Sequence, residues 1–87
     1  MLNIYKNMPT IDLHGETGSI AKILVHDFIE DNYKLKNEMI VIIHGIGKGI
    51  VKKAVYEELK ENKYVKEYKQ DNFNSGETIV RLNICKH

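Results

Sequence analysis

The chain has 87 residues, of which 43% are hydrophobic and 29% are charged, so it can form one small globular domain. Thirteen basic and twelve acidic residues give a formal net charge of +1, which excludes a polycation that binds phosphates through surplus charge alone. The longest apolar run, residues 39–43, is too short for a transmembrane helix, so no membrane partner is expected. The single cysteine cannot form an internal disulfide, which favours a cytoplasmic location.

The first two elements are predicted from apolar spacing. Residues 11–15, Ile-Asp-Leu-His-Gly, alternate between apolar and polar and predict a short strand with the isoleucine and leucine facing a core. Residues 19–35 show helical spacing and predict an amphipathic helix, with Thr17 or Ser19 as its cap. The positions expected to face inward are Ile20, Ala21, Leu24, Val25 and Phe28, and those expected to face outward are Lys22, His26, Glu30 and Tyr33.

A buried strand and a second helix follow. Residues 39–43 form a continuous apolar run, which is typical of a strand covered on both faces. The glycine-rich segment 44–49 closes this strand, and residues from 50 to about 62 predict a helix. The inward stripe of this helix is expected to be Val51, Ala54, Val55 and Leu59.

The last part of the chain predicts two more strands. Residues 64–70 and 78–84 alternate between apolar and polar, and a turn is expected at 71–76 between them. In the last strand, one face is expected to hold Thr78, Val80, Leu82 and Ile84. The order β-α-β-α-β-β indicates an α/β fold, a two-layer sandwich whose first strands run parallel. We assign residues 1–9 to an N-terminal extension, 10–84 to a single domain and 85–87 to a C-terminal tail.

Asp12 and His14 are the first candidate catalytic residues. They are two apart on a predicted strand, so their side chains are expected on the same face. A carboxylate beside an imidazole can orient the ring, and the histidine can then act as general acid or base near neutral pH. The pair could also hold a divalent cation at a phosphate. In the structural alternative, Asp12 accepts hydrogen bonds from turn amides and His14 is a polar residue at a strand end.

The segment His44-Gly-Ile-Gly-Lys-Gly49 is the stronger candidate. Its glycines let backbone amides approach an anion closely, and the following helix terminus adds a partial positive charge. The spacing matches neither a P-loop nor a dinucleotide fingerprint, and a tight turn that packs the helix on the sheet is the alternative. The two His-Gly pairs lie thirty residues apart and are expected at the ligand-binding carboxyl edge of the sheet. The expected phosphate contacts are His44, Gly45, Gly47, Lys48, Gly49, Lys52 and Lys53.

Charge is divided unevenly along the chain. Residues 10–40 hold three lysines and six acidic residues, whereas residues 44–70 hold seven lysines and four acidic residues. The second segment could present a basic patch with Tyr56, Tyr64 and Tyr68 interleaved, whose rings can stack on bases. The alternative is a solvated lysine face with tyrosines that cover the core.

Together, the segments 11–15, 44–49 and 77–82 resemble motifs of the Smr (small MutS-related) domain, and the resemblance covers residues 10–83. It implies a sandwich similar to the C-terminal domain of translation initiation factor 3. The family includes the C-terminal domain of MutS2 and stand-alone bacterial proteins, the type expected here. Its members nick DNA, cleave RNA on stalled ribosomes, or bind nucleic acid without cutting. By this resemblance Asp12 and His14 are the catalytic pair, and the glycine-rich loop positions the phosphate.

Two main functions remain open at this point. The first is an endonuclease that acts on DNA or RNA, in which Lys48 and the loop amides stabilise the anionic transition state. The second is a non-catalytic module that binds nucleic acid or the ribosome through the same loop and the face of Lys52 and Lys53. A small phosphorylated ligand ranks last. Whether a divalent cation is a cofactor stays open, because one carboxylate and two histidines make a small ligand set.

Overall fold

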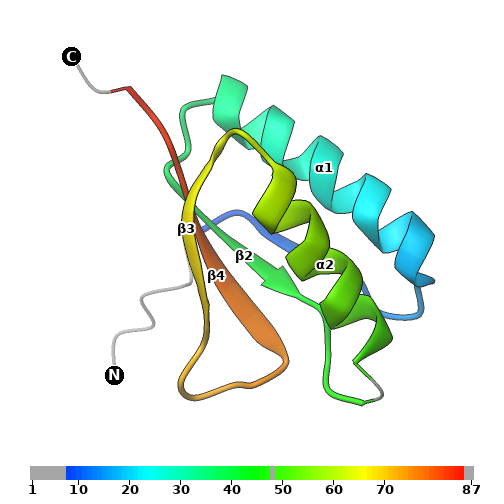
Figure 1. Cartoon of the computed structure of the whole chain (residues 1–87). Coiled ribbons are helices and arrows are strands. Elements are labelled where there is room, and N and C mark those ends of the chain that lie inside the picture. Colours follow the sequence, from blue (N-terminus) through cyan, green and yellow to red (C-terminus); the bar gives the residue numbers. More distant parts are fainter. Residues whose placement is uncertain (1–7, 48, 86–87) are drawn as a thin grey trace.

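The structure is a computed structural model that describes residues 8–47 and 49–85. Two helices lie on one face of a four-stranded sheet, as Figure 1 shows, which confirms the predicted two-layer α/β fold and its element order. Among the described helices, none is long and apolar enough to cross a membrane. The elements are β1 (Thr10–Asp12), α1 (Gly18–Lys34), β2 (Met39–Ile43), α2 (Ile50–Glu61), β3 (Val65–Gln70) and β4 (Glu77–Leu82).

The strands are arranged in the order β1-β2-β4-β3. β1 and β2 run parallel, as predicted, while β4 pairs antiparallel with both β2 and β3. Thr10 pairs with Val41, and the strand register therefore has an offset of 31 residues. Because the His-Gly pairs repeat after thirty residues, they are displaced by one residue relative to this register. The carboxyl ends of β1 and β2 nevertheless meet at one edge, and each strand leads from there into a helix.

The core lies between the sheet and the helices. In β2, Ile40 and Ile42 are fully buried against the helices, and in β4 Val80 and Leu82 occupy the same layer. Side chains alternate across a strand, so Val41 points to the opposite face. Val41 is also buried, so β2 is covered on both faces at this position, as predicted, although the helices cover only one face.

The first helix begins where the sequence predicts, but its buried stripe is different. The hydroxyl of Thr17 accepts a hydrogen bond from the backbone N–H of Ile20, 3.2 Å away, which confirms Thr17 as the cap. The prediction that Ile20 faces inward is wrong, because its side chain is 44% exposed. The buried stripe extends further toward the C-terminal end of the helix than predicted, and its members are Ala21, Val25, Ile29 and Asn32.

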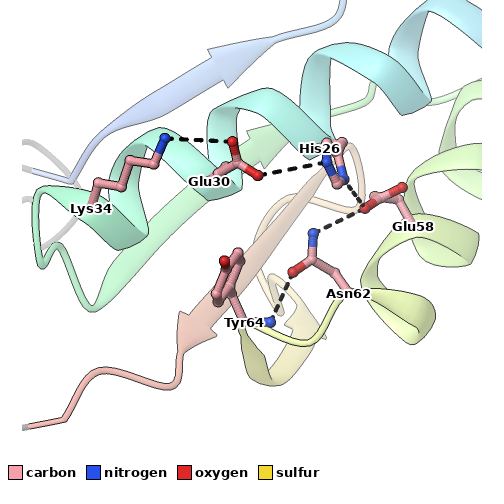
Figure 2. Close-up of polar contacts among 6 residues, drawn as sticks. All are labelled: His26, Glu30, Lys34, Glu58, Asn62 and Tyr64. Carbon is pink, nitrogen blue, oxygen red and sulfur yellow. Dashed lines mark hydrogen bonds and ion pairs between the residues drawn. The ribbon is translucent and has the colours of Figure 1, made fainter.

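A polar cluster joins the two helices, as Figure 2 shows. Nδ1 of His26 lies 2.9 Å from Oε2 of Glu58, which also accepts a hydrogen bond from the amide of Asn62. Asn62 in turn accepts a hydrogen bond from the backbone N–H of Tyr64, at the start of the next strand. The hydrogen bond to Glu58, with nearby acidic charges, raises the pKa of His26 above 6.5. His26 is exposed, as expected of an outward-facing position, and its contact with Glu58 also ties α1 to α2.

Candidate functional site

A pocket of about 410 Å³ lies where the carboxyl edge of the parallel strands meets the amino ends of both helices. We call it the phosphate pocket, after the ligand that the sequence predicts for the glycine-rich segment. Its wall combines the connection from β1 to α1, the glycine-rich loop after β2 and the first turn of α2. Two helix termini direct backbone N–H groups and partial positive charge toward this one cavity. The lining residues are Glu16, Thr17, Gly18, His44, Gly45, Ile46, Gly49, Ile50, Val51 and Lys52.

The two helix ends at the phosphate pocket differ in their capping. The end of α1 has a side-chain cap, since Thr17 accepts the N–H of Ile20. The N-cap of α2 is Gly49, which has no side chain to offer and adopts a left-handed conformation with φ of 78°. Residues with a Cβ rarely adopt this conformation. The first-turn amides of α2 therefore receive no side-chain acceptor from their cap, and an anion can fill that role.

The ring of His44 points inward beneath the loop, and the residue is only 8% exposed although it lines the pocket. Nδ1 lies 3.0 Å from the carbonyl oxygen of Gly45, and Nε2 lies 2.8 Å from Oγ1 of Thr78. The hydroxyl of Tyr56 lies 3.0 Å from the same Thr78 oxygen. One assignment satisfies every group: Nδ1–H donates to Gly45, Nε2 accepts from Thr78, and Tyr56 donates to Thr78. We call His44, Thr78 and Tyr56 the buried polar network.

Burial lowers the pKa of His44 below 6.5, and the positive charge of Lys52 lowers it further. The hydrogen bond to the Gly45 carbonyl acts in the opposite direction but is the smaller effect. His44 is therefore a neutral imidazole near pH 7. Because both ring nitrogens have protein partners, the side chain fixes the start of the loop rather than presenting a free nitrogen to the pocket.

The turn between β3 and β4 supports the loop from below. The backbone N–H groups of His44 and Gly45 both donate to the carbonyl oxygen of Gly76, each at 2.9 Å. A Cβ at Gly76 would lie 3.3 Å from Cα and C of Gly45, which is closer than side chains normally approach. The side chain of Asn74 accepts the N–H of Gly76 and holds the turn in this position. Glycine is thus required here for close backbone packing.

Asp12 and His14 lie beside the phosphate pocket and are absent from its lining. β1 ends at Asp12, so His14 belongs to the following turn instead of the strand that was predicted to reach Gly15. Oδ1 of Asp12 accepts the backbone N–H of His14 at 3.0 Å, which is the contact expected in the structural alternative. Both side chains are exposed. Glu16, which sequence reasoning did not identify, is the acidic residue on the pocket wall.

The predicted basic residues are distributed over two surfaces. Lys52 lines the phosphate pocket, and its ammonium group donates to Oε1 of Gln70 on β3. Lys53 is exposed and lines neighbouring surfaces instead. Gly47 has a φ of 144° and does not line the pocket. Lys48 lies outside the described residues.

Two further features bear on the chemistry of the site. Within residues 8–47 and 49–85, no three side chains of His, Cys, Asp or Glu gather where they could hold a metal ion. Thr78 was predicted only as an inward position on its strand, although it is the centre of the buried polar network. A hydroxyl among inward apolar residues was the available signal, because a buried polar group needs a partner.

The chain is similar to a short part of several longer proteins that share one name. Endonuclease MutS2 of Clostridium perfringens is 29% identical over 85 residues, which cover 98% of this chain and 11% of that protein. Endonuclease MutS2 of Halothermothrix orenii is 34% identical over 77 residues, which cover 85% of this chain and 10% of that protein. The chain thus spans about a tenth of the length of these relatives.

Solved structures show the same fold. The Smr domain of Thermus thermophilus MutS2 has a TM-score of 0.84 and 26% identity, covering 87% of this chain and 99% of that one. YdaL, a stand-alone small MutS-related protein of Escherichia coli, has a TM-score of 0.81 and 24% identity, covering 87% of this chain and 65% of that one. The model of the Smr domain family matches residues 11–83. This chain therefore belongs to the Smr domain family.

Proposed function

We propose that this Smr domain binds nucleic acid at the phosphate pocket and cleaves a phosphodiester bond. The observation that carries the proposal is the α2 terminus, which has no side-chain cap at Gly49 and opens into a pocket shared with the amino end of α1. Phosphate oxygens are well suited to such N–H groups. The similarity to proteins named Endonuclease MutS2 supports nucleic acid as the source of the phosphate.

The chemistry divides between the pocket and the residues beside it. The first-turn amides of α2 and the charge of Lys52 stabilise the negative charge that develops on the phosphoryl group. His14 is the proposed general acid or base, because it is exposed and lies two residues before Glu16, which lines the pocket. Asp12 holds the backbone of His14 and contributes negative charge next to it. His44 positions the loop, and Lys48 and Lys53 stay predicted phosphate contacts.

The test uses substitutions that preserve the local turn. Asp12→Asn removes the charge but keeps an oxygen that can accept the His14 N–H, and His14→Gln removes the imidazole ring. Asp31→Asn, at an exposed position of α1, is the matched control. Labelled DNA and RNA, single- and double-stranded, are incubated with each protein with and without EDTA. We expect each site variant to lose about a hundredfold or more of cleavage with binding retained. Wild-type cleavage by both variants would contradict the assignment.

A non-catalytic binding module is the second candidate, and one observation favours it. The Asp12 carboxylate already accepts the His14 backbone N–H, and neither side chain lies on the wall of the phosphate pocket. This reading predicts that the wild-type protein binds nucleic acid but leaves it intact under every condition of the same assay. An RNA carried by the ribosome is one such partner, and co-sedimentation with ribosomes tests it.

A further inference from the structure

A second depression, of about 480 Å³, continues from the phosphate pocket along α2. We call it the α2 groove. It shares Gly49 and Lys52 with the phosphate pocket, so a chain-like ligand bound at the pocket can pass directly into the groove. Its lining residues are Gly49, Lys52, Lys53, Tyr56, Glu57 and Lys60 from α2 and its cap, and Tyr68 from β3.

The charge of the α2 groove suits a polyanion. Three of its residues are lysines and one, Glu57, is acidic. Lys53 and Lys60 are exposed and seven residues apart, which places them on one side of the helix about 10 Å from each other. Within the described part of the chain, neither lysine takes part in an ion pair. Their charges are therefore available to successive phosphates of one strand.

Two tyrosines give the groove an aromatic floor. The rings of Tyr56 and Tyr68 meet edge to face, with centroids 5.4 Å apart and planes inclined by 72°. The Tyr56 hydroxyl is held by Thr78, and the Lys52 ammonium lies 5.6 Å from the Tyr56 ring centroid. Tyr68, on the edge strand β3, is the ring that this arrangement leaves for a ligand. Bases of a single strand stack on such rings, whereas bases in a duplex are already stacked on one another.

We infer that the α2 groove holds single-stranded nucleotides next to the phosphodiester in the phosphate pocket. The backbone of the strand follows Lys53 and Lys60, and its bases turn toward Tyr68. The inference rests on the proposed function, since the strand enters the groove from the pocket, and it names single-stranded DNA or RNA as the substrate class.

The test compares two neighbouring lysines that carry the same charge. Lys60→Gln removes a cation from the groove, and Lys63→Gln removes one that lies over the Tyr64 ring, outside the groove. Binding is measured by fluorescence anisotropy with a labelled oligonucleotide of roughly twelve nucleotides, single-stranded or as a duplex. We expect Lys60→Gln to weaken single-strand binding about threefold or more and to reduce the salt slope by about 0.7. Lys63→Gln should change binding by less than about twofold.

A second variant tests the aromatic floor. Tyr68→Leu keeps an apolar side chain but removes the ring, and it should weaken single-strand binding about fivefold or more with little effect on the duplex. Circular dichroism checks its fold, and if it unfolds, the lysine pair decides alone. The groove assignment would be overturned if Lys60→Gln and Lys63→Gln lost equal binding affinity, or if the duplex lost as much affinity as the single strand. In either case, binding by the wild-type protein leaves the proposed function standing. A wild-type protein that binds no nucleic acid overturns both.

Discussion

Nε2 of His44 lies 2.8 Å from Oγ1 of Thr78, and this contact joins the start of the glycine-rich loop to the inward face of β4. Thr78 is fully buried, and its hydroxyl also contacts Tyr56 of α2. Groups from three elements thus satisfy one another directly under the phosphate pocket. Since buried polar groups are costly when unpaired, this arrangement favours one position of the loop.

Thr78→Val should therefore destabilise the protein. Valine has nearly the shape of threonine but leaves the His44 nitrogen and the Tyr56 hydroxyl without their partner. We expect the free energy of unfolding to fall by about 2 kcal/mol, measured by urea denaturation. Thr10→Val is the matched control, because the exposed Thr10 hydroxyl donates to the Met8 carbonyl and has no other hydrogen bond within residues 8–47 and 49–85. It should change stability by less than about 0.5 kcal/mol. Similar losses in both proteins would contradict a stabilising role for the network.

The buried network also predicts the protonation of His44. Burial and the charge of Lys52 lower its pKa, so the neutral form should persist at pH 6.5, where an ordinary histidine is half protonated. The Gly45 carbonyl should keep the proton on Nδ1. Long-range ¹H–¹⁵N NMR spectra of the imidazole between about pH 8 and pH 5 report both properties. A ring that is half protonated at or above pH 6.5, or one with its proton on Nε2, would contradict the assignment.

His26 should make the stability of the protein depend on pH. Its pKa is raised in the folded protein, chiefly by the hydrogen bond to Glu58, so its stabilisation is complete below pH 6.5 and is lost as the pH rises through the folded-state pKa. His26→Gln should thus lower the free energy of unfolding more at about pH 5.5 than at about pH 9. In a Glu58→Gln background, His26→Gln should lower the free energy of unfolding by nearly the same amount at both pH values. Urea denaturation of the wild type, the two single variants and the double variant measures these differences. A cost that grows with pH would show that the ion pair is absent.

Much of the fold could be predicted because apolar periodicity reports burial directly. The alternation of β4 correctly placed Thr78, Val80 and Leu82 on one face. In α1 the apolar residues occupy so much of the helix circumference that helical spacing alone does not identify the buried stripe. The spacing predicts Ile20 as an inward residue, whereas Ile29 is the buried one. Tertiary packing against the sheet and α2 decides between such positions, and a local pattern does not contain it.

The candidate site was predictable as a location but less so in its detailed contacts. The parallel pairing of β1 and β2 brings both His-Gly segments to one edge, as the order of elements implied. The inward orientation of His44 depends on Thr78, which is 34 residues away and on another strand. The place of His14 depends on where β1 ends, and strand ends are poorly defined by alternation. Contacts between distant segments therefore set the roles of these residues.

Gly76→Ala should displace the turn that supports the loop. Its Cβ would lie 3.2 Å from the Asn74 side-chain oxygen and 3.3 Å from the Gly45 backbone, and backbone atoms cannot move aside cheaply. We expect a loss of about 1–3 kcal/mol in the free energy of unfolding, since crowding a packed position strains its neighbours. Weaker oligonucleotide binding should accompany it, because the Gly76 carbonyl accepts the N–H groups of His44 and Gly45 at the pocket.

The matched control is Gly18→Ala at the first position of α1. Its Cβ would lie 3.5 Å from Ile50 and 3.6 Å from Ala54, which are ordinary van der Waals contacts, and alanine favours the helix. Stability should change by less than about 1 kcal/mol, in the stabilising direction. Urea denaturation compares the stability of the two variants, and anisotropy compares binding by Gly76→Ala with binding by the wild type. If Gly76→Ala were as stable as wild type and bound equally well, close packing of the turn on Gly45 would not be what holds the loop.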